Sequence, residues 1–215
     1  HRIHAGHRPQ RAPVGEAPDR TAVVEPDRFG GTCLNRGCIP SKMFVYAADL
    51  AEYARRGPAL GVATSFAGAD WKAIRDRVFG RIDPIAEGGR DYRHALDQVT
   101  VYETEGCFTG PRTLAVGNEL ITGDRFVVAA GARSMVPDIP GIAGVPYHAS
   151  DTIMRVDEIP EHLIVLGGGF IAAEMGHVFG AFGSAVTIIQ RGPRLLMAED
   201  EEISARFTEV VGHRF

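Results

Sequence analysis

The stretch HLIVLGGGFIAAEMGHVFGAFG (162–183) decides the fold class. Its first five residues, HLIVL (162–166), are an apolar run typical of a buried strand, and three glycines separate them from an apolar helical pattern. The next run, SAVTIIQRG (184–192), has strand composition again. Strand, tight turn, helix and strand in this order form a βαβ unit. We therefore predict an α/β protein built from three-layer, Rossmann-like domains.

The glycines of this turn have the spacing of a dinucleotide-binding motif, GGGFIAAE (167–174). Gly167 allows the tight turn, Gly169 lets a pyrophosphate approach the backbone, and Ala172 in the third small position lets the helix pack closely. Gly168, between them, belongs to the same predicted site. The alternative is a tight turn that binds no ligand.

The end of the second strand, at Gln190, selects the nicotinamide cofactor. An acid there suits the free 2′-hydroxyl of NAD, whereas arginine suits the 2′-phosphate of NADP. Gln190 occupies the acid position and is followed by Arg191 and Arg194. We predict NADPH, with both arginines at the phosphate; each of them could instead be an ordinary surface charge.

A second motif, GGTCLNRGCIPSK (30–42), precedes a helical pattern at residues 43–56. Cys33 and Cys38 lie near a helix start, where unpaired N–H groups and partial positive charge stabilise a thiolate, and Lys42 adds a cation. The glycines permit close approach by a flat cofactor or its phosphates. The alternatives are two unrelated core cysteines or half of a metal site. No other Cys-x-x-Cys or clustered histidine supports a metal, so we predict none.

The whole string resembles the redox-active segment of the pyridine nucleotide–disulfide oxidoreductases, such as glutathione reductase, dihydrolipoyl dehydrogenase and mercuric reductase. The resemblance implies that Cys33 is the interchange thiol and that Cys38 lies against the flavin as the charge-transfer thiolate. It implies that Lys42 lies near the flavin and pairs with Glu174. The third cysteine, Cys107, matches no cysteine of the family, and we predict a buried strand residue.

The same resemblance implies that FAD is bound by an acid, several small residues and a threonine. The acid, at the end of the predicted strand TAVVE (21–25), would bind the adenosine ribose, and the glycine in TEGCF (104–108) would let adenine approach the backbone. The run FVVAAG (126–131) resembles a family motif in which a strand is followed by Ala-x-Gly near FAD. The predicted FAD contacts are Glu25, Gly30, Gly31, Thr32, Gly106, Ala130 and Gly131, together with Lys42.

The chain divides into three parts in this interpretation. Residues 1–19 show no periodicity and match nothing in the family, so we expect disorder. Residues 20–155 are expected to form a partial FAD-binding domain that carries the dithiol, and residues 156–215 the first part of an NAD(P)H-binding domain. Within the first of these, residues 71–96 predict one or two helices, interrupted near Pro84 and Gly88–Gly89.

The resemblance also predicts that the domains are incomplete. An FAD domain of this kind has a glycine fingerprint about 20 residues before its ribose-binding acid, and residues 1–19 contain none. We expect the N-terminal fingerprint, the C-terminal dimerisation domain and the general-base histidine to lie outside the chain.

The composition of the chain indicates which classes of partner and which compartment to expect. The chain has 215 residues, a formal net charge of −4 and 45% hydrophobic residues, which is typical of a soluble globular protein. Neither a nucleic-acid nor a membrane partner is expected, because the charge is mildly acidic and no apolar run approaches about 20 residues. Three cysteines and no secretory signal favour the cytoplasm.

Three further stretches resemble the mycothione-reducing branch of the family: residues 41–52, 78–93 and 147–183. The implied function is a flavoprotein disulfide reductase that passes electrons from NADPH through FAD and the Cys33–Cys38 dithiol to a low-molecular-weight disulfide, mycothione. The full-length family member is expected to be a homodimer. Residues 78–93 are expected to carry substrate specificity or to form a packing helix. The alternatives are a dihydrolipoyl dehydrogenase-like or other family member, and a non-catalytic truncated remnant.

Overall fold

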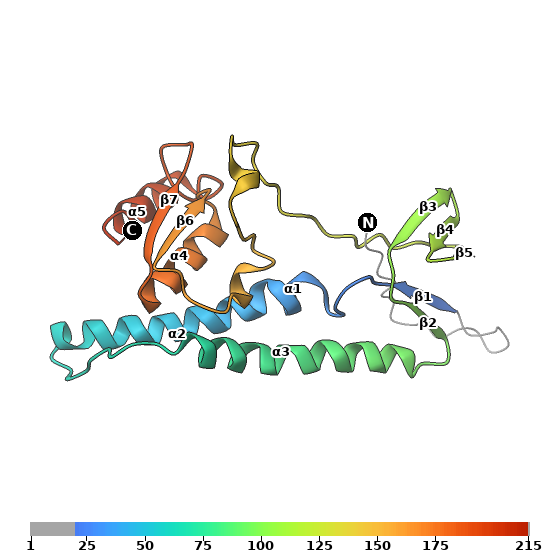
Figure 1. Cartoon of the computed structure of the whole chain (residues 1–215), viewed down its shortest axis with the longest axis horizontal. Helices are drawn as coiled ribbons and strands as arrows, with labels where there is room; N and C mark the ends of the chain where they lie inside the picture. The colour runs from blue at the N-terminus through green and yellow to red at the C-terminus, as the bar shows by residue number, and fades with distance from the viewer. Residues whose placement is uncertain (1–19, 215) are drawn as a thin grey trace. The chain divides into compact units, whose positions relative to one another are not determined.

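The computed structural model describes residues 20–214, which form two compact units (Figure 1). The first unit contains residues 20–35 and 82–139, and the second contains residues 36–81 and 140–214. The predictions for residues 1–19, disorder and a missing fingerprint, lie outside the described residues. The predicted domain boundary near residue 155 stays a prediction.

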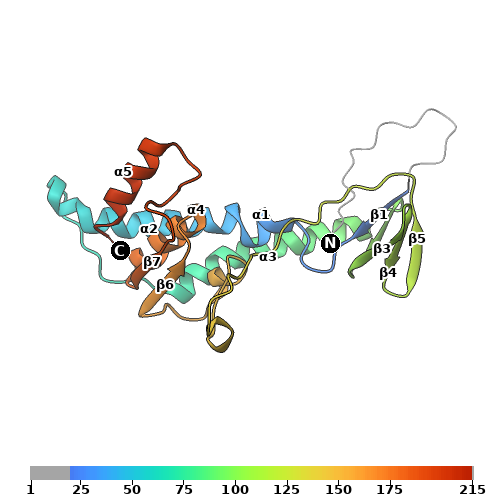
Figure 2. The same ribbon diagram turned by 90° about the horizontal axis from the view of Figure 1, so that it is seen from above.

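The first unit contains two small sheets, all but the last residue of the short helix α1 (Gly31–Arg36), and residues 82–94 of the long helix α3 (Trp71–His94). Strand β1 (Thr21–Val24) pairs in parallel with β2 (Val99–Tyr102), so that Thr21 lies opposite Val99. Both strands consist largely of β-branched residues, which suit a pleated surface. An antiparallel meander, visible in Figure 2, follows in the order β3 (Gly106–Gly110), β4 (Thr113–Val116) and β5 (Glu119–Thr122). Val24, Leu114 and Val116 form the core of this unit.

The second unit confirms the predicted βαβ motif. Strand β6 (His162–Leu166) pairs in parallel with β7 (Ala185–Ile189), and α4 (Phe170–Phe182) connects them. Figure 1 shows α4 beside the two strands, and α2 (Cys38–Arg56) packs against α4. The last helix is α5 (Glu201–Val211), which begins after the N-cap Asp200. Three single-turn 3₁₀ helices complete the described elements: Gly57–Leu60, Ile142–Gly144 and Ile153–Arg155.

An aromatic cluster holds the helices of the second unit together. The ring of Trp71, at the start of α3 (Trp71–His94), stacks on Phe44 of α2 at 5.0 Å between ring centroids. It also contacts Phe179 of α4 at 5.2 Å. The indole Nε1–H donates to the carbonyl oxygen of Val156 at 2.8 Å, so the buried polar atom of the ring has a partner. The start of α2, which carries Cys38, is therefore part of a packed scaffold.

The predicted break within residues 71–96 is wrong: α3 is one helix that contains Pro84 and both glycines, Gly88 and Gly89. Proline removes one backbone hydrogen bond and crowds the carbonyl four residues earlier. Buried residues at helical spacing, Val78, Phe79, Ile82 and Ala86, stabilise the helix through packing, which overrides local propensity.

Three other local predictions need correction. Residues 126–131 form no strand, because a strand needs a neighbour to pair its backbone and none of the described strands pairs with them. Cys107 lies in strand β3 as predicted but is exposed, because this strand belongs to a small meander whose outer face is open. The helix predicted over residues 43–56 begins earlier, at Cys38. No helix within residues 20–214 has the length and apolarity that crossing a membrane requires.

Candidate active site

Cys33 and Cys38 are joined in a disulfide, which confirms the predicted pair. Cys33 lies in α1, and Cys38 is the first residue of α2. Both residues are exposed. The third cysteine, Cys107, is not part of this pair.

Two glycines form the turn that precedes Cys33. Gly30 and Gly31 have φ values of +103° and +67°, in the region that favours glycine. A Cβ atom on Gly30 would lie 2.4 Å from Cδ2 of Leu34, so no larger residue fits there without displacement. At Gly31 the added atom would meet nothing within 4 Å, which leaves the backbone accessible to a ligand. Thr32, the other residue predicted here, is exposed on α1.

Asn35 fastens this turn, and the sequence prediction did not include it. Its side chain is only 3% exposed, and its amide nitrogen donates to the carbonyl oxygens of Phe29 at 3.0 Å and Gly31 at 2.9 Å. A third, longer contact of 3.4 Å reaches the carbonyl of Arg28. An asparagine between two cysteines resembles an ordinary turn residue. The signal in the sequence was its position inside the glycine-rich motif, where the carbonyl groups of a tight turn need hydrogen-bond donors.

The start of α2 provides a favourable environment for a thiolate at Cys38. Gly37 is the N-cap residue, no side chain caps the helix, and its first turn contains no acid. The partial positive charge at the start of this 19-residue helix therefore acts on Cys38 without a competing anion.

Lys42, one turn further along α2, forms an ion pair with Glu174 of α4. This confirms the predicted Lys42–Glu174 pair. The lysine side chain is 61% exposed and the glutamate 27%, so solvent screens the pair and its contribution to stability is small. The contact of these residues with a flavin stays a prediction.

Glu25 follows β1 directly and is fully buried. Its backbone N–H donates to the carbonyl of Tyr102 at 3.0 Å, and its Oε1 accepts from the N–H of Asp27 at 3.0 Å. Gly106 packs against the same core, where a Cβ would lie 3.1 Å from Leu114 and 3.2 Å from Val24. This packing gives Gly106 a structural reason to be glycine. The proposed contacts of Glu25 and Gly106 with FAD stay predictions.

Ala130 and Gly131 lie in the extended segment that follows the meander rather than at a strand end. Ala130 is half-buried, and Gly131 is exposed with φ +66°. The contact of Ala130 and Gly131 with FAD stays a prediction.

The glycine turn after β6 has the form that a dinucleotide site requires. Gly167 has φ +115°, and its N–H donates to the carbonyl of Ile189 at 2.9 Å, which ties the turn to the end of β7. Gly169 is the N-cap of α4, and Ala172 is buried in that helix. A Cβ atom at Gly167 or Gly169 would meet nothing within 4 Å. The turn thus leaves room for a pyrophosphate at a helix start.

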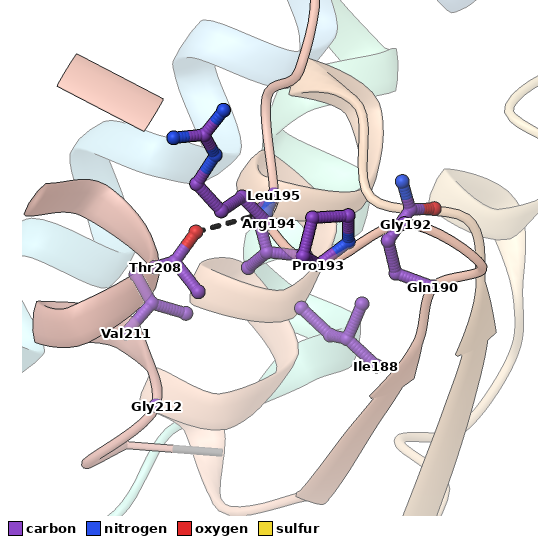
Figure 3. A pocket seen from close by; sticks show the side chains of 9 residues that line it. All are labelled: Ile188, Gln190, Gly192, Pro193, Arg194, Leu195, Thr208, Val211 and Gly212. Atoms are coloured by element: carbon purple, nitrogen blue, oxygen red, sulfur yellow. Dashed lines mark hydrogen bonds between the residues drawn. The ribbon is translucent and has the colours of Figure 1, made fainter. Parts of the chain in front are cut away.

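A pocket of about 240 Å³ lies beyond the end of β7 (Figure 3). Figure 3 shows Gln190 on one side of it, with Thr208 and Val211 of α5 on the other. Arg194 also lines the pocket, and its Nη1 pairs with Oε1 of Glu201 at 2.7 Å. The structure therefore brings together two of the three residues predicted to select the cofactor. Arg191 is exposed and does not line this pocket.

The family model described as pyridine nucleotide-disulphide oxidoreductase matches residues 5–214, so the prediction that residues 1–19 match nothing in the family is wrong for residues 5–19. The chain belongs to this family. It is 45% identical over 208 residues to the mycothione reductase of Mycobacterium tuberculosis, an alignment that covers 93% of this chain. It is 34% identical to the mercuric reductase of Staphylococcus aureus and 31% identical to the dihydrolipoyl dehydrogenase of Bacillus subtilis, over 88% and 86% of this chain.

The solved structure of the HOCl-induced flavoprotein disulfide reductase RclA from Escherichia coli matches 91% of the chain with a TM-score of 0.76 and 28% identity. The fold is therefore that of the pyridine nucleotide–disulfide oxidoreductases. The chain spans less than half the length of these relatives: 45% for mycothione reductase, 35% for mercuric reductase, 42% for dihydrolipoyl dehydrogenase and 42% for RclA.

Membership in the pyridine nucleotide–disulfide oxidoreductases assigns the observed disulfide a redox function. The chain is a member of a flavoprotein disulfide reductase family, and Cys33–Cys38 is its redox-active disulfide. The described part of the chain contains no group of three His, Cys, Asp or Glu side chains placed to hold a metal ion.

Proposed function

We propose that this chain carries the dithiol centre of an NADPH-dependent flavoprotein disulfide reductase whose substrate is the low-molecular-weight disulfide mycothione. The observation that supports it most is the exposed Cys33–Cys38 disulfide at the start of a helix whose first turn has no acid. The 45% identity to mycothione reductase favours mycothione over the other disulfides of the family.

The reaction at the sulfur atoms follows from thiol–disulfide exchange. In the reduced dithiol, the Cys33 thiolate attacks one sulfur of the substrate disulfide, which forms a mixed disulfide and releases one thiolate. The Cys38 thiolate then attacks the sulfur of Cys33, which re-forms the Cys33–Cys38 disulfide and releases the second thiolate. Both released thiolates take up a proton. The substrate gains two electrons, and the dithiol loses two.

FAD, when bound, carries two electrons from NADPH to the Cys33–Cys38 disulfide. The open backbone at Gly31 fits the phosphates of FAD. We propose that Lys42 lies near the flavin. We propose that Glu25, Gly30, Thr32 and the small residues Gly106, Ala130 and Gly131 complete the FAD contacts.

The turn at residues 167–169 fits the pyrophosphate of NADPH, since the backbone at Gly167 and Gly169 is open. Arg194, which lines the pocket beside Gln190, supports NADPH over NADH, because a guanidinium suits a 2′-phosphate. We propose that Arg191 assists from the rim.

The full enzyme is proposed to act as a homodimer in the cytoplasm. Thiols are kept reduced in that compartment, so a cysteine pair there is used for catalysis rather than for stability. Residues 78–93 belong to α3, the next α-helix after the dithiol helix α2 in the chain, and we propose that they contribute to substrate choice.

The test is NADPH oxidation by the FAD-loaded chain, followed by absorbance, with mycothione, glutathione disulfide and lipoamide as substrates. We expect mycothione with NADPH to be the most active combination. If lipoamide with NADH is the fastest, the proposed substrate and cofactor are both wrong. If the chain binds no FAD and oxidises no NADPH with any disulfide, it is the non-catalytic alternative. The Cys33→Ser variant is the negative control.

A further inference from the structure

Both backbone polar groups of Leu195 are held by side chains of α5. The N–H of Leu195 donates to Oγ1 of Thr208 at 2.8 Å, the bond drawn in Figure 3. The hydroxyl of Ser204 donates to the carbonyl oxygen of Leu195 at 2.6 Å. Ser204 and Thr208 are four residues apart and therefore lie on the same face of the helix. The hydroxyl of Thr208 in turn donates to the carbonyl of Ser204 at 2.8 Å, which orients its lone pairs toward Leu195.

The glycine turn of the dinucleotide site holds the same segment from the other side. The N–H of Leu196 donates to the carbonyl oxygen of Gly168 at 2.7 Å, and a Cβ on Gly168 would lie only 2.7 Å from Cδ2 of Leu195. Leu196 has φ +53°, which is uncommon for a residue with a side chain and persists only where the surroundings hold it. Residues 195–196 thus connect the glycine turn to α5.

Arg194 precedes this connection directly and lines the pocket at the end of β7. Its guanidinium pairs with Glu201, which also belongs to α5. The Nε atom of Arg194 is buried and has no hydrogen-bond partner in the part of the chain that the structure describes. Buried donors are normally satisfied, so this N–H is suited to an anionic group that enters the pocket.

We propose that Ser204 and Thr208 are positioning residues that hold Arg194 at the nucleotide site and thereby determine the preference for a 2′-phosphorylated cofactor. This inference rests on the proposed use of NADPH. A guanidinium recognises phosphate through a rigid fork of donors, so its contribution depends on where its backbone is fixed. Without the hydroxyls of Ser204 and Thr208, the backbone of Leu195 loses its two hydrogen bonds to α5. The backbone of Arg194, the preceding residue, is then no longer held in one position.

The experiment compares the binding of adenosine 2′,5′-bisphosphate and 5′-AMP to the full chain by titration calorimetry. The first ligand carries the 2′-phosphate and the second does not. In Thr208→Val we expect the affinity for the bisphosphate to fall about five- to tenfold, the equivalent of one hydrogen bond, and the affinity for AMP to change less than about twofold. Thr208→Ser keeps the hydroxyl and is expected to retain the preference of the parent chain.

A matched control is Thr187→Val on β7. The Thr187 hydroxyl contacts Nε2 of His162 at 2.8 Å on an exposed face, and this residue does not line the pocket. The control should leave the ratio of the two affinities unchanged. If Thr208→Val does not fold, as judged by its circular dichroism melting curve, Ser204→Ala replaces it with the same expected shift in the ratio.

The outcomes separate the two proposals. If the parent chain binds both nucleotides with equal affinity, the proposed use of NADPH is wrong. If the parent chain prefers the bisphosphate and the variants keep that preference, or lose affinity for both nucleotides equally, Ser204 and Thr208 do not act through Arg194, and the inference is overturned.

Discussion

Two glycine turns lead into helices in this protein, and they are stabilised in different ways. The turn at Gly30–Gly31 is held by neighbours in sequence, namely the amide of Asn35 and the Cys33–Cys38 disulfide. The turn at residues 167–169 is held by groups that are distant in sequence, the carbonyl of Ile189 and the N–H of Leu196. The redox centre is therefore encoded locally, whereas the nucleotide turn depends on the tertiary fold.

The largest expected effect comes from removing a sulfur of the local turn. Cys33→Ser and Cys38→Ser should each lower NADPH-driven disulfide reduction by at least about a thousandfold, because a serine hydroxyl cannot replace the thiolate nucleophile. Titration of the reduced, unfolded chain should find three thiols in the parent and two in each variant. Nucleotide binding at residues 167–169 should stay within about twofold. A variant that retains the reduction rate of the parent would show that the disulfide is not the redox centre.

The next largest effect, on the free energy of unfolding, is expected at Asn35, whose side-chain amide holds the Gly30–Gly31 turn by hydrogen bonds. Asn35→Asp replaces an amide donor by a carboxylate among three carbonyl oxygens, and we expect the free energy of unfolding to fall by about 3 kcal/mol. Denaturant unfolding measures this change. Asn118→Asp, in an exposed turn of the meander, is the matched control and should change stability by less than about 0.5 kcal/mol. Equal effects at both positions would contradict the local fastening.

A smaller effect is expected at the nucleotide turn. A Cβ on Gly168 would lie 2.7 Å from Leu195 and 3.1 Å from Gln190, both flexible side-chain ends that can shift. Gly168→Ala should therefore reduce the free energy of unfolding by about 1 kcal/mol. Gly80→Ala, in open space on α3, should instead stabilise the chain by up to about 1 kcal/mol. Thermal unfolding of both variants checks the difference in sign; stabilisation by Gly168→Ala would disprove the tertiary contact.

The smallest effect belongs to the Lys42–Glu174 pair, which joins α2 to α4. A double-mutant cycle with Lys42→Met and Glu174→Gln should give a coupling energy of about 0.5 kcal/mol that declines as salt is added. A coupling above about 2 kcal/mol would mean that the pair is shielded from solvent, contrary to the 61% exposure of the lysine side chain.

The predictions from sequence were confirmed where they depended on a local pattern of residues. They were wrong where the structure depends on contacts with residues that are distant in sequence. The βαβ unit followed from apolar runs around a glycine turn, and both of its strands pair with each other. The run at residues 126–131 is also apolar, but none of the described strands pairs with it. Pro84 lies inside a helix because buried neighbours stabilise it, and Cys107 is exposed because its sheet is open on one face.

The sequence by itself determined the dithiol pair, the glycine turns and the family, because each depends on residue types at fixed short spacing. Only the tertiary structure decided which side chains hold those motifs in place. It connected Gly168 to Leu196 and placed Arg194 rather than Arg191 in the pocket beside α5. Such contacts join residues whose separation along the chain carries no pattern, so they exist only once the elements have packed.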